Sequence, residues 1–333
     1  MKIVLDVFGG DNAPQEILNG AKAALEKESD FELVLCGKKD IIDAYIKENS
    51  LDETRITVLD ATEVITNDES PVDAVRNKPD SSIVKAYDYL NADSDAKAFV
   101  SAGSTGAVLT GAVLLLKRIK GINRPALSPV LPTVTDKNVL LIDCGANTEP
   151  KAINLVQFAK MGSAFMKCVY GVKSPKVGLL SNGTEDKKGN TLNKEAFPML
   201  KESGINFVGN MEAREILSGD YDVVVSDGFS GNIALKASEG TALGMFGLIK
   251  DGIMKGGLRA KLGYLLLKPV FKGVKKKMDY NDNGGAVLLG LQKIVVKSHG
   301  SSKAKAICNS ILQAKNMVDS GIIEKIGEEL SVK

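Results

Sequence analysis

Four short loops rich in glycine and polar residues carry the side chains best suited to bind an anion. Each follows a short apolar run, and they span 6–14 (DVFGGDNAP), 101–107 (SAGSTGA), 143–147 (DCGAN) and 227–232 (DGFSGN). Glycines let the backbone approach a ligand closely, and successive N–H groups can then point at it. Together, the four loops predict one crevice of phosphate size where several strands end.

The second and fourth loops each lead from a strand-like run into a helix-like segment. In the second loop, the hydroxyls of Ser101, Ser104 and Thr105 add donors at a helix N-terminus, a place that favours anions. In the fourth, Asn232 can both donate and accept hydrogen bonds, and Lys236 follows about one turn into the helix, where it can neutralise an anion. Taken alone, either loop could be an ordinary turn with a helix cap.

The first and third loops and one further segment offer acids, amides and lysines. The first and third loops supply Asp6, Asp11, Asn12, Asp143 and Asn147. Any of these acids could instead cap a helix. The segment 179–190 (LLSNGTEDKKGN) follows another strand-like run and carries Glu185, Lys187 and Lys188 within reach of the same crevice. An exposed charged turn is the alternative for this segment.

Several familiar active-site types are disfavoured. His299 is the only histidine, and 228–231 (GFSG) is one residue too short for a G-x-S-x-G nucleophile elbow, which argues against a serine hydrolase. One histidine and unpaired cysteines argue against a transition-metal centre. No strand-like run precedes G-x-G-x-x-G, and no G-x-x-x-x-G-K-[ST] occurs. What remains is anion binding without a nucleotide motif, with His299 as a capping residue or a base.

The alternation of apolar runs and helix-like segments predicts an α/β, doubly wound fold. The strand-like runs are 3–7, 31–36, 56–59, 98–101, 139–142, 177–180, 207–208 and 223–226, and the helix-like segments are 14–27, 81–91, 106–119, 155–170 and 193–203. Runs that are apolar throughout fit strands buried on both faces of a parallel sheet. No linker or repeat divides the chain, so 1–333 is taken as a single unit, with two lobes as the open alternative.

Composition and charge predict a soluble cytoplasmic protein. The 333 residues are 44% hydrophobic and 25% charged, with a formal charge of only +2, so a charge-driven partner has to meet a local patch and no nucleic-acid partner is expected. The N-terminus shows no export signal, and the longest aliphatic stretch, 107–116, is shorter than the ~20 residues of a membrane-spanning helix. The four cysteines form no C-x-x-C pair and are expected to be reduced thiols.

One segment departs from the α/β pattern. Between Gly252 and Met278 there are eight basic residues, no acidic one and many leucines, and Pro269 is expected to divide the segment into two short helices. One interpretation is a helical hairpin packed at a subunit interface. The other is a surface that contacts anionic lipid or an acidic protein, where each Lys or Arg contributes ~1 kcal/mol and half of the eight give roughly 4 kcal/mol. Both can hold at once.

Taken in order, the motifs resemble those of one protein family nearly end to end. They are DVFGGDNAP, SAGSTGA, RPAL (124–127), DCGAN, GLLSNGTEDKKGN (178–190), FVGNME (207–212), DVVVSDGFSGNIALK (222–236), YNDNGGAVLLG (280–290) and KSHGSS (297–302). The chain is similar to the PlsX phosphate acyltransferases of bacterial phospholipid synthesis. The resemblance implies a homodimeric three-layer α/β/α enzyme, mainly parallel in its sheet and similar in fold to phosphate acetyltransferases and isocitrate dehydrogenase-like proteins.

The resemblance also implies an activity and partners. A long fatty acyl group would move from acyl carrier protein to inorganic phosphate, and the acyl phosphate would feed a membrane acyltransferase that acylates glycerol 3-phosphate. The family is cytoplasmic and peripherally membrane associated, which gives the segment 252–278 a purpose as a protruding basic and apolar hairpin. No cofactor and no metal are expected. The alternatives are a short-chain phosphate acyltransferase that uses coenzyme A, and a non-catalytic scaffold at the membrane.

Phosphate is itself a nucleophile, so such an enzyme only has to hold it against the thioester and stabilise the oxyanion. The residues predicted for catalysis are Lys188, Asn232 and Lys236. Those predicted for substrate binding are Asp6, Gly9, Gly10, Asp11, Asn12, Ser101, Gly103, Ser104, Thr105, Gly106, Asp143, Asn147, Asn210, Asp227, Gly231 and His299. Those predicted for membrane or carrier-protein contact are Lys255, Arg259, Lys261, Leu265, Leu266, Leu267, Lys268 and Lys272.

Overall fold

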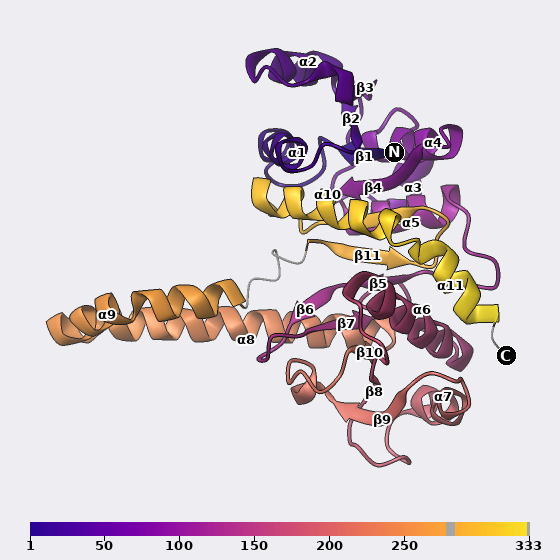
Figure 1. Cartoon of the computed structure of the whole chain (residues 1–333), viewed down its shortest axis with the longest axis vertical. Coiled ribbons are helices and arrows are strands. Elements are labelled where there is room, and N and C mark those ends of the chain that lie inside the picture. The colour runs from indigo at the N-terminus through magenta and orange to yellow at the C-terminus, as the bar shows by residue number, and fades with distance from the viewer. Residues whose placement is uncertain (278–283, 332–333) are drawn as a thin grey trace.

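The computed structural model describes residues 1–277 and 284–331, apart from the side chains at 275, 276 and 331. Met278, where the predicted basic segment ends, lies outside the described residues, as do the side chains of Lys275 and Lys276 and part of the motif at 280–290. Helices cover both faces of two mainly parallel sheets (Figure 1). The predicted doubly wound α/β architecture is therefore confirmed.

The first sheet has seven strands in the order β3-β2-β1-β4-β12-β11-β5. Their bounds are β3 Ile56–Asp60, β2 Glu32–Gly37, β1 Lys2–Asp6, β4 Ala96–Ser101, β12 Ile294–Lys297, β11 Ala286–Leu289 and β5 Ala126–Ser128. Strand β11 runs antiparallel to both of its neighbours, whereas the other pairs are parallel. Parallel strands end on the same edge, so loops that are distant in sequence meet there.

The second sheet has five strands in the order β6-β7-β10-β8-β9. Their bounds are β6 Val130–Pro132, β7 Asn138–Ile142, β10 Val223–Val225, β8 Val177–Ser181 and β9 Phe207–Glu212. Only β6 is antiparallel to its neighbour among these described strands. The longer strands and the three-residue β10 were predicted from the sequence, whereas β5, β6, β11 and β12 were not. Runs of three or four residues give little periodicity.

Alternate residues of the strands face helices on opposite sides. The helices are α1 Gln15–Lys27, α2 Lys39–Glu48, α3 Pro71–Asn77, α4 Ser82–Ala92, α5 Thr105–Leu115, α6 Ala152–Tyr170, α7 Thr191–Lys201, α8 Gly228–Lys255, α9 Gly257–Lys277, α10 Ala304–Asp319 and α11 Ile322–Ser331. In β1, Ile3 and Leu5 pack with α1 and α10, whereas Val4 packs with α4 and α5. These side chains are fully buried, which explains why the strand is apolar throughout.

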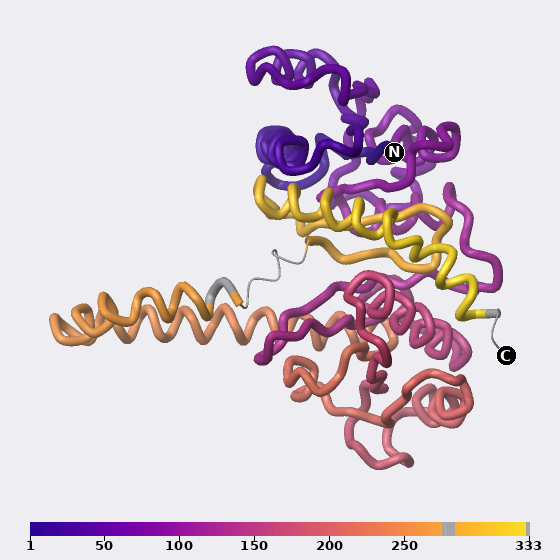
Figure 2. The backbone as a smooth tube through the Cα atoms, viewed as in Figure 1, coloured from indigo at the N-terminus to yellow at the C-terminus, as the bar shows by residue number. Residues whose placement is uncertain are grey.

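The C-terminal part of the chain returns to the first sheet after the second sheet is complete. Strand β12 inserts between β4 and β11, and Lys297 pairs in register with Ser101. Figure 2 shows this late segment, in orange and yellow, beside the earliest part of the chain. The insertion carries residues 297–302 to the edge where the first two glycine-rich loops lie.

Helices α8 and α9 form a hairpin that projects from the body of the molecule (Figure 1). The expectation that Pro269 divides the segment 252–278 was wrong. The chain turns at Gly257, whose φ of +71° favours glycine, and Pro269 lies inside α9. The hairpin is also longer than predicted, since α8 already begins at Gly228. No helix among the described residues is long and apolar enough to cross a membrane.

Candidate active site

A cavity of about 520 Å³ receives residues from all four glycine-rich loops and from both sheets. It is lined by Asp11, Asn67, Gly103, Thr105, Leu127, Pro129, Val130, Leu131, Cys144, Gly145, Asn232, Leu235, Lys236, Glu239, Gly284, Gly285, Ala286, Lys297, Ser298, His299 and Gly300. The size suits a small anion together with part of a larger substrate. The structure thus brings Asp11, Gly103, Thr105, Asn232, Lys236 and His299 of the predicted site residues to one place.

Asp6 joins the first loop to the second. Its carboxylate is 1% exposed and accepts hydrogen bonds from Ser101 Oγ at 2.7 Å and from the Phe8 N–H at 3.2 Å. Ser101 Oγ in turn accepts from the Gly103 N–H at 2.9 Å. A Cβ at Gly9 would lie 2.6 Å from the Gly103 nitrogen, so only glycine fits there. Burial raises the pKa of Asp6, and this network holds the two loops rather than reaching into the cavity.

The first loop is also joined to residues 299–302. The Asp11 N–H donates to the Gly300 carbonyl at 2.8 Å, and Asn12 Nδ2 donates to the Ser301 carbonyl at 3.0 Å. His299 Nδ1 lies 2.8 Å from Ser301 Oγ, and this exposed residue is part of the cavity lining. Asn12 therefore positions the first loop against residues 299–302.

The second loop starts helix α5 at the cavity. Ser104 caps the helix, since its Oγ accepts from the Ala107 N–H at 3.5 Å. Thr105, the first helical residue, lines the cavity. The first N–H groups of a helix have no partner within it and favour an anion. Gly106 does not line the cavity; its absent side chain makes room for Pro71, whose Cγ would lie 2.5 Å from a Cβ.

In the third loop, Asp143 and Asn147 are structural. The Asp143 carboxylate accepts from the N–H groups of Leu127 at 2.9 Å, Ala146 at 3.1 Å and Asn147 at 2.7 Å, and from Asn147 Nδ2 at 2.8 Å. Burial raises the pKa of Asp143, and also that of the neighbouring Cys144 thiol in the cavity wall. Cys144 is therefore a poor nucleophile, because the thiolate is the reactive form.

The fourth loop begins helix α8. Asp227 caps it by accepting from the N–H groups of Phe229 at 3.0 Å and Ser230 at 2.8 Å. Gly231 lies against the Asp143 carbonyl so closely that a Cβ would overlap it. This close contact brings the first turns of α8, with Asn232 and Lys236, against the third loop. The two side chains line the cavity about one helical turn apart.

Two predicted residues lie elsewhere, Lys188 in the loop after β8 and Asn210 within β9. Asn210 Nδ2 donates to the Glu185 carbonyl at 2.8 Å, and the Lys188 N–H donates to the same carbonyl at 2.9 Å. Neither residue lines the cavity. The Asn210 Oδ1 and Ser181 Oγ atoms are buried without a partner among the described residues. The loop at 181–190 therefore forms its own polar cluster beside the second sheet.

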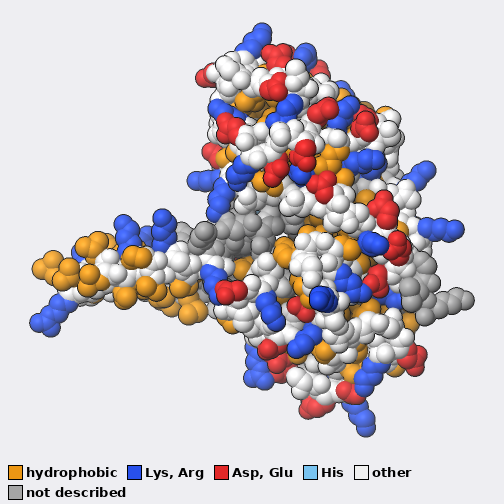
Figure 3. Space-filling view, in the orientation of Figure 1, with side chains coloured by type: hydrophobic (Ala, Val, Ile, Leu, Met, Phe, Trp, Pro, Cys, Tyr) orange, Lys and Arg blue, Asp and Glu red, His pale blue; other side chains and the backbone are white. Residues whose placement is uncertain are grey.

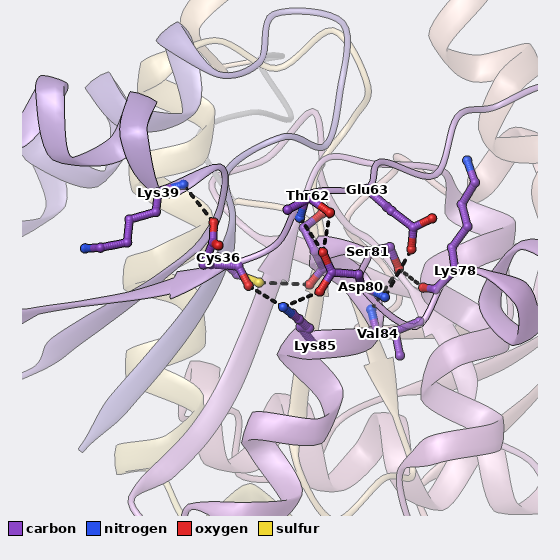
Figure 4. Close-up of polar contacts among 11 residues, drawn as sticks. Cys36, Lys39, Thr62, Glu63, Lys78, Asp80, Ser81, Val84 and Lys85 are labelled. Atoms are coloured by element: carbon purple, nitrogen blue, oxygen red, sulfur yellow. Dashed lines mark hydrogen bonds and ion pairs between the residues drawn. The ribbon is translucent and has the colours of Figure 1, made fainter.

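Three further residues that were not predicted from the sequence also line the cavity, namely Lys297, Glu239 and Asn67. Lys297 stands first in the motif KSHGSS, so the signal was present. Asn67 lies in the loop between β3 and α3, and polar contacts join the start of this loop to the turn that follows α3. Figure 4 shows Asp80 between Thr62 and Lys85; the Thr62 N–H donates to the carboxylate at 2.9 Å and Lys85 forms an ion pair with it. The sequence by itself gives no sign that Asn67 is placed at the cavity in this way.

Solved structures place this arrangement in a class. A phosphotransacetylase from Streptococcus pyogenes is 18% identical and superimposes with a TM-score of 0.60, covering 96% of this chain and 94% of its own. At this identity the likeness shows the fold alone. The fold is that of the phosphotransacetylases, with two mainly parallel sheets covered by helices.

Relatives of higher sequence identity show the family to which the chain belongs. The model of the family described as "Fatty acid synthesis protein" matches residues 1–325. The phosphate acyltransferases of Clostridium novyi (strain NT) and Clostridium botulinum (strain Alaska E43 / Type E3) are 47% and 45% identical over 335 and 334 residues. Each alignment covers 100% of this chain and 99% or 100% of the relative. The chain belongs to this family, the PlsX phosphate acyltransferases, and is an acyltransferase.

Proposed function

We propose that this enzyme transfers a long fatty acyl group from acyl carrier protein to inorganic phosphate. The products are an acyl phosphate and the free carrier protein, and the acyl phosphate feeds a membrane enzyme that acylates glycerol 3-phosphate. The observation that carries the proposal is the cavity itself, where a helix N-terminus, amide and lysine groups converge and the cysteine is unreactive. The family's link to fatty acid synthesis favours a fatty acyl donor.

The transfer needs no protein nucleophile. A phosphate oxygen attacks the thioester carbonyl carbon, the carbon–sulfur bond breaks, and the proton of hydrogen phosphate passes to the leaving thiolate. In the proposed mechanism the N-terminus of α5 and Lys236 hold phosphate, and Asn232 donates to the oxyanion of the tetrahedral intermediate. The network of Asp6 and Asp143 keeps the surrounding loops in place before substrate arrives.

Lys188, in the loop after β8, is proposed to supply charge, and Asn210, within β9, is proposed to orient a substrate group. Their distance from the cavity lining makes them the weakest members of the proposed site. Turnover of Lys188→Ala and Asn210→Ala tests them; unchanged turnover in both removes them from the mechanism. The whole chain is proposed to act as one catalytic unit, supported by a hydrophobic core that runs through both sheets.

We also propose that the α8–α9 hairpin contacts the membrane surface or the acidic carrier protein, and that the enzyme is a cytoplasmic homodimer bound peripherally to membranes. Two features of the hairpin support this proposal. Leu258, Leu265 and Leu266 are 88%, 63% and 75% exposed. Figure 3 shows hydrophobic side chains gathered along the projecting hairpin, with lysines and arginines beside them. Apolar residues flanked by cations suit an anionic lipid surface.

The deciding experiment measures thiol release from palmitoyl-acyl carrier protein with and without inorganic phosphate, and identifies the acyl product by mass. Phosphate-dependent release with acyl phosphate formed is the expected result. Release without phosphate would indicate a hydrolase. Release only from short-chain acyl-coenzyme A would favour the alternative donor, and no release from folded protein would favour a scaffold.

A further inference from the structure

Lys297 is a lysine buried at the wall of the cavity. It ends strand β12 in register with Ser101, and the residue is 7% exposed. Its Nζ donates to the Ser298 carbonyl, and it forms no ion pair with any carboxylate of the described residues. A buried ammonium group without an anionic partner is costly, so such a site favours either a neutral amine or an anion supplied by a ligand.

Charged side chains of both signs lie around Lys297. Asp6 and Asp11 lie near enough to favour the ammonium form, but burial dominates and lowers the pKa of Lys297 to about 8. The Asp6 carboxylate already accepts from Ser101 and the first loop. Lys236, Glu239 and His299 also line the cavity. Lys297 therefore lies near two acids of the first loop, and one of them, Asp11, lines the cavity with it.

We infer that Lys297 binds the phosphate nucleophile, together with the N-terminal N–H groups of α5. The two groups share one edge of the first sheet, since β12 and β4 are parallel neighbours and α5 follows β4 directly. Thr105 and Lys297 line the same cavity, so an anion between them meets a cation and a helix N-terminus at once. This assignment rests on the proposed transfer to phosphate and names the residue that anchors the nucleophile.

Binding of the phosphate dianion makes Lys297 take up a proton. In the free enzyme at pH 8.5 much of the Lys297 population is neutral, because its pKa is about 8. A bound dianion stabilises the ammonium form and raises that pKa, so phosphate and a proton bind together. Phosphate in solution is already mostly dianionic at this pH, so its own ionisation contributes little to the proton count.

Isothermal calorimetry at pH 8.5 in two buffers with different heats of ionisation measures this proton uptake. Wild-type enzyme is expected to take up a substantial fraction of a proton per phosphate bound. Lys297→Met is expected to bind phosphate roughly 10- to 100-fold more weakly and to take up none. Lys297→Arg, which is charged at every pH used, is expected to restore part of the affinity without proton uptake.

Two further variants separate the role of Lys297 from general effects. Lys293→Met is the matched control, because Lys293 lies at the opposite end of β12 from Lys297, does not line the cavity and donates to the Ala96 carbonyl at 2.6 Å. It should leave affinity and proton uptake unchanged. Lys236→Met should weaken binding yet keep the proton uptake. A melting temperature of Lys297→Met at or above that of wild type shows that the fold is intact.

The outcomes distinguish this inference from the proposed function. If wild-type enzyme binds phosphate without proton uptake and Lys297→Met binds it equally well, Lys297 is not the anchor, although transfer to phosphate can stand. If wild-type enzyme binds no phosphate and shows no phosphate-dependent release of thiol, the proposed function itself fails.

Discussion

The cavity and the α8–α9 hairpin both present lysines, but they present them in opposite ways. In the cavity, Lys297 is 7% exposed, and the nearby loops are joined by buried carboxylates. On the hairpin, the cations stand in solvent beside leucines such as Leu266, which is 75% exposed. A buried, prearranged cation can recognise a small anion by itself. Exposed cations and leucines stabilise binding only when a large surface covers them.

The space around two glycines of α8 also differs between the cavity end and the hairpin. At Gly231, where α8 starts beside the third loop, a Cβ would overlap the Asp143 carbonyl, whereas at Gly240 further along α8 a Cβ would meet nothing within 4 Å. The start of α8 is therefore packed tightly against the third loop, whereas α8 around Gly240 has space beside it. The difference indicates that substitutions in the cavity act on turnover and stability, whereas those in the hairpin act on association.

The largest effect is expected from the cavity side of α8. Asn232→Ala or Lys236→Ala should lower turnover ~100-fold with the fold intact, because each removes a donor or a charge from the transition state. Steady-state kinetics with phosphate and acyl carrier protein measure this, with circular dichroism as the control for folding. Wild-type turnover in both variants would remove these residues from the mechanism.

Alanine substitutions at Gly231 and Gly240 test this difference in packing by their effect on the free energy of unfolding. Gly231→Ala should lower the free energy of unfolding by about 2 kcal/mol, roughly 30-fold in the equilibrium constant, because α8 has to move away from Asp143. Gly240→Ala should instead raise it by about 0.5 kcal/mol through helix propensity. Chemical denaturation measures both. A destabilised Gly240→Ala protein would mean that α8 is packed against a partner chain.

The hairpin leucines test the association side of the comparison. Replacing Leu265, Leu266 and Leu267 together by Ser should weaken binding to anionic vesicles by about tenfold, because apolar surface no longer enters the interface. Vesicle flotation measures the binding, and analytical ultracentrifugation shows whether the dimer survives. Val113→Ser with Leu114→Ser is the matched control, since these side chains on α5 are 51% and 50% exposed. Unchanged vesicle binding with a disrupted dimer would assign the hairpin to the subunit interface.

The smallest effect is expected from screening of the hairpin cations. Raising the salt concentration from about 50 to 300 mM should lower kcat/KM for acyl carrier protein by about threefold, because exposed charges are screened. Replacing Lys255, Arg259 and Lys261 together by Gln should flatten this dependence. If kcat/KM of the wild-type enzyme does not change with salt concentration, electrostatic docking of the carrier protein is excluded.

Much of the fold could be predicted from the sequence because its signals are local. Apolar runs such as 139–142 and glycine-rich loops such as 101–107 are continuous in the chain. The short strands β5, β6, β11 and β12 were not predicted, whereas the equally short β10 was, since its apolar run leads directly into a glycine-rich loop. Strands of three or four residues are stabilised by their neighbours in the sheet more than by their own pattern. The turn of the hairpin was misplaced at Pro269 because a proline within a helix is tolerated here, whereas Gly257 adopts the conformation that a turn needs.

By itself, the sequence determined the fold class, the family and the loops that form the site, because glycines and polar residues after strands leave a pattern in the chain. Only the tertiary structure decided which side chains of those loops reach the cavity. Asp6 and Asp143 proved to hold loops together, and Lys297 came to the cavity wall through the insertion of β12 beside β4. The direction and burial of a side chain depend on neighbours that are distant along the chain, and a linear pattern carries no record of them.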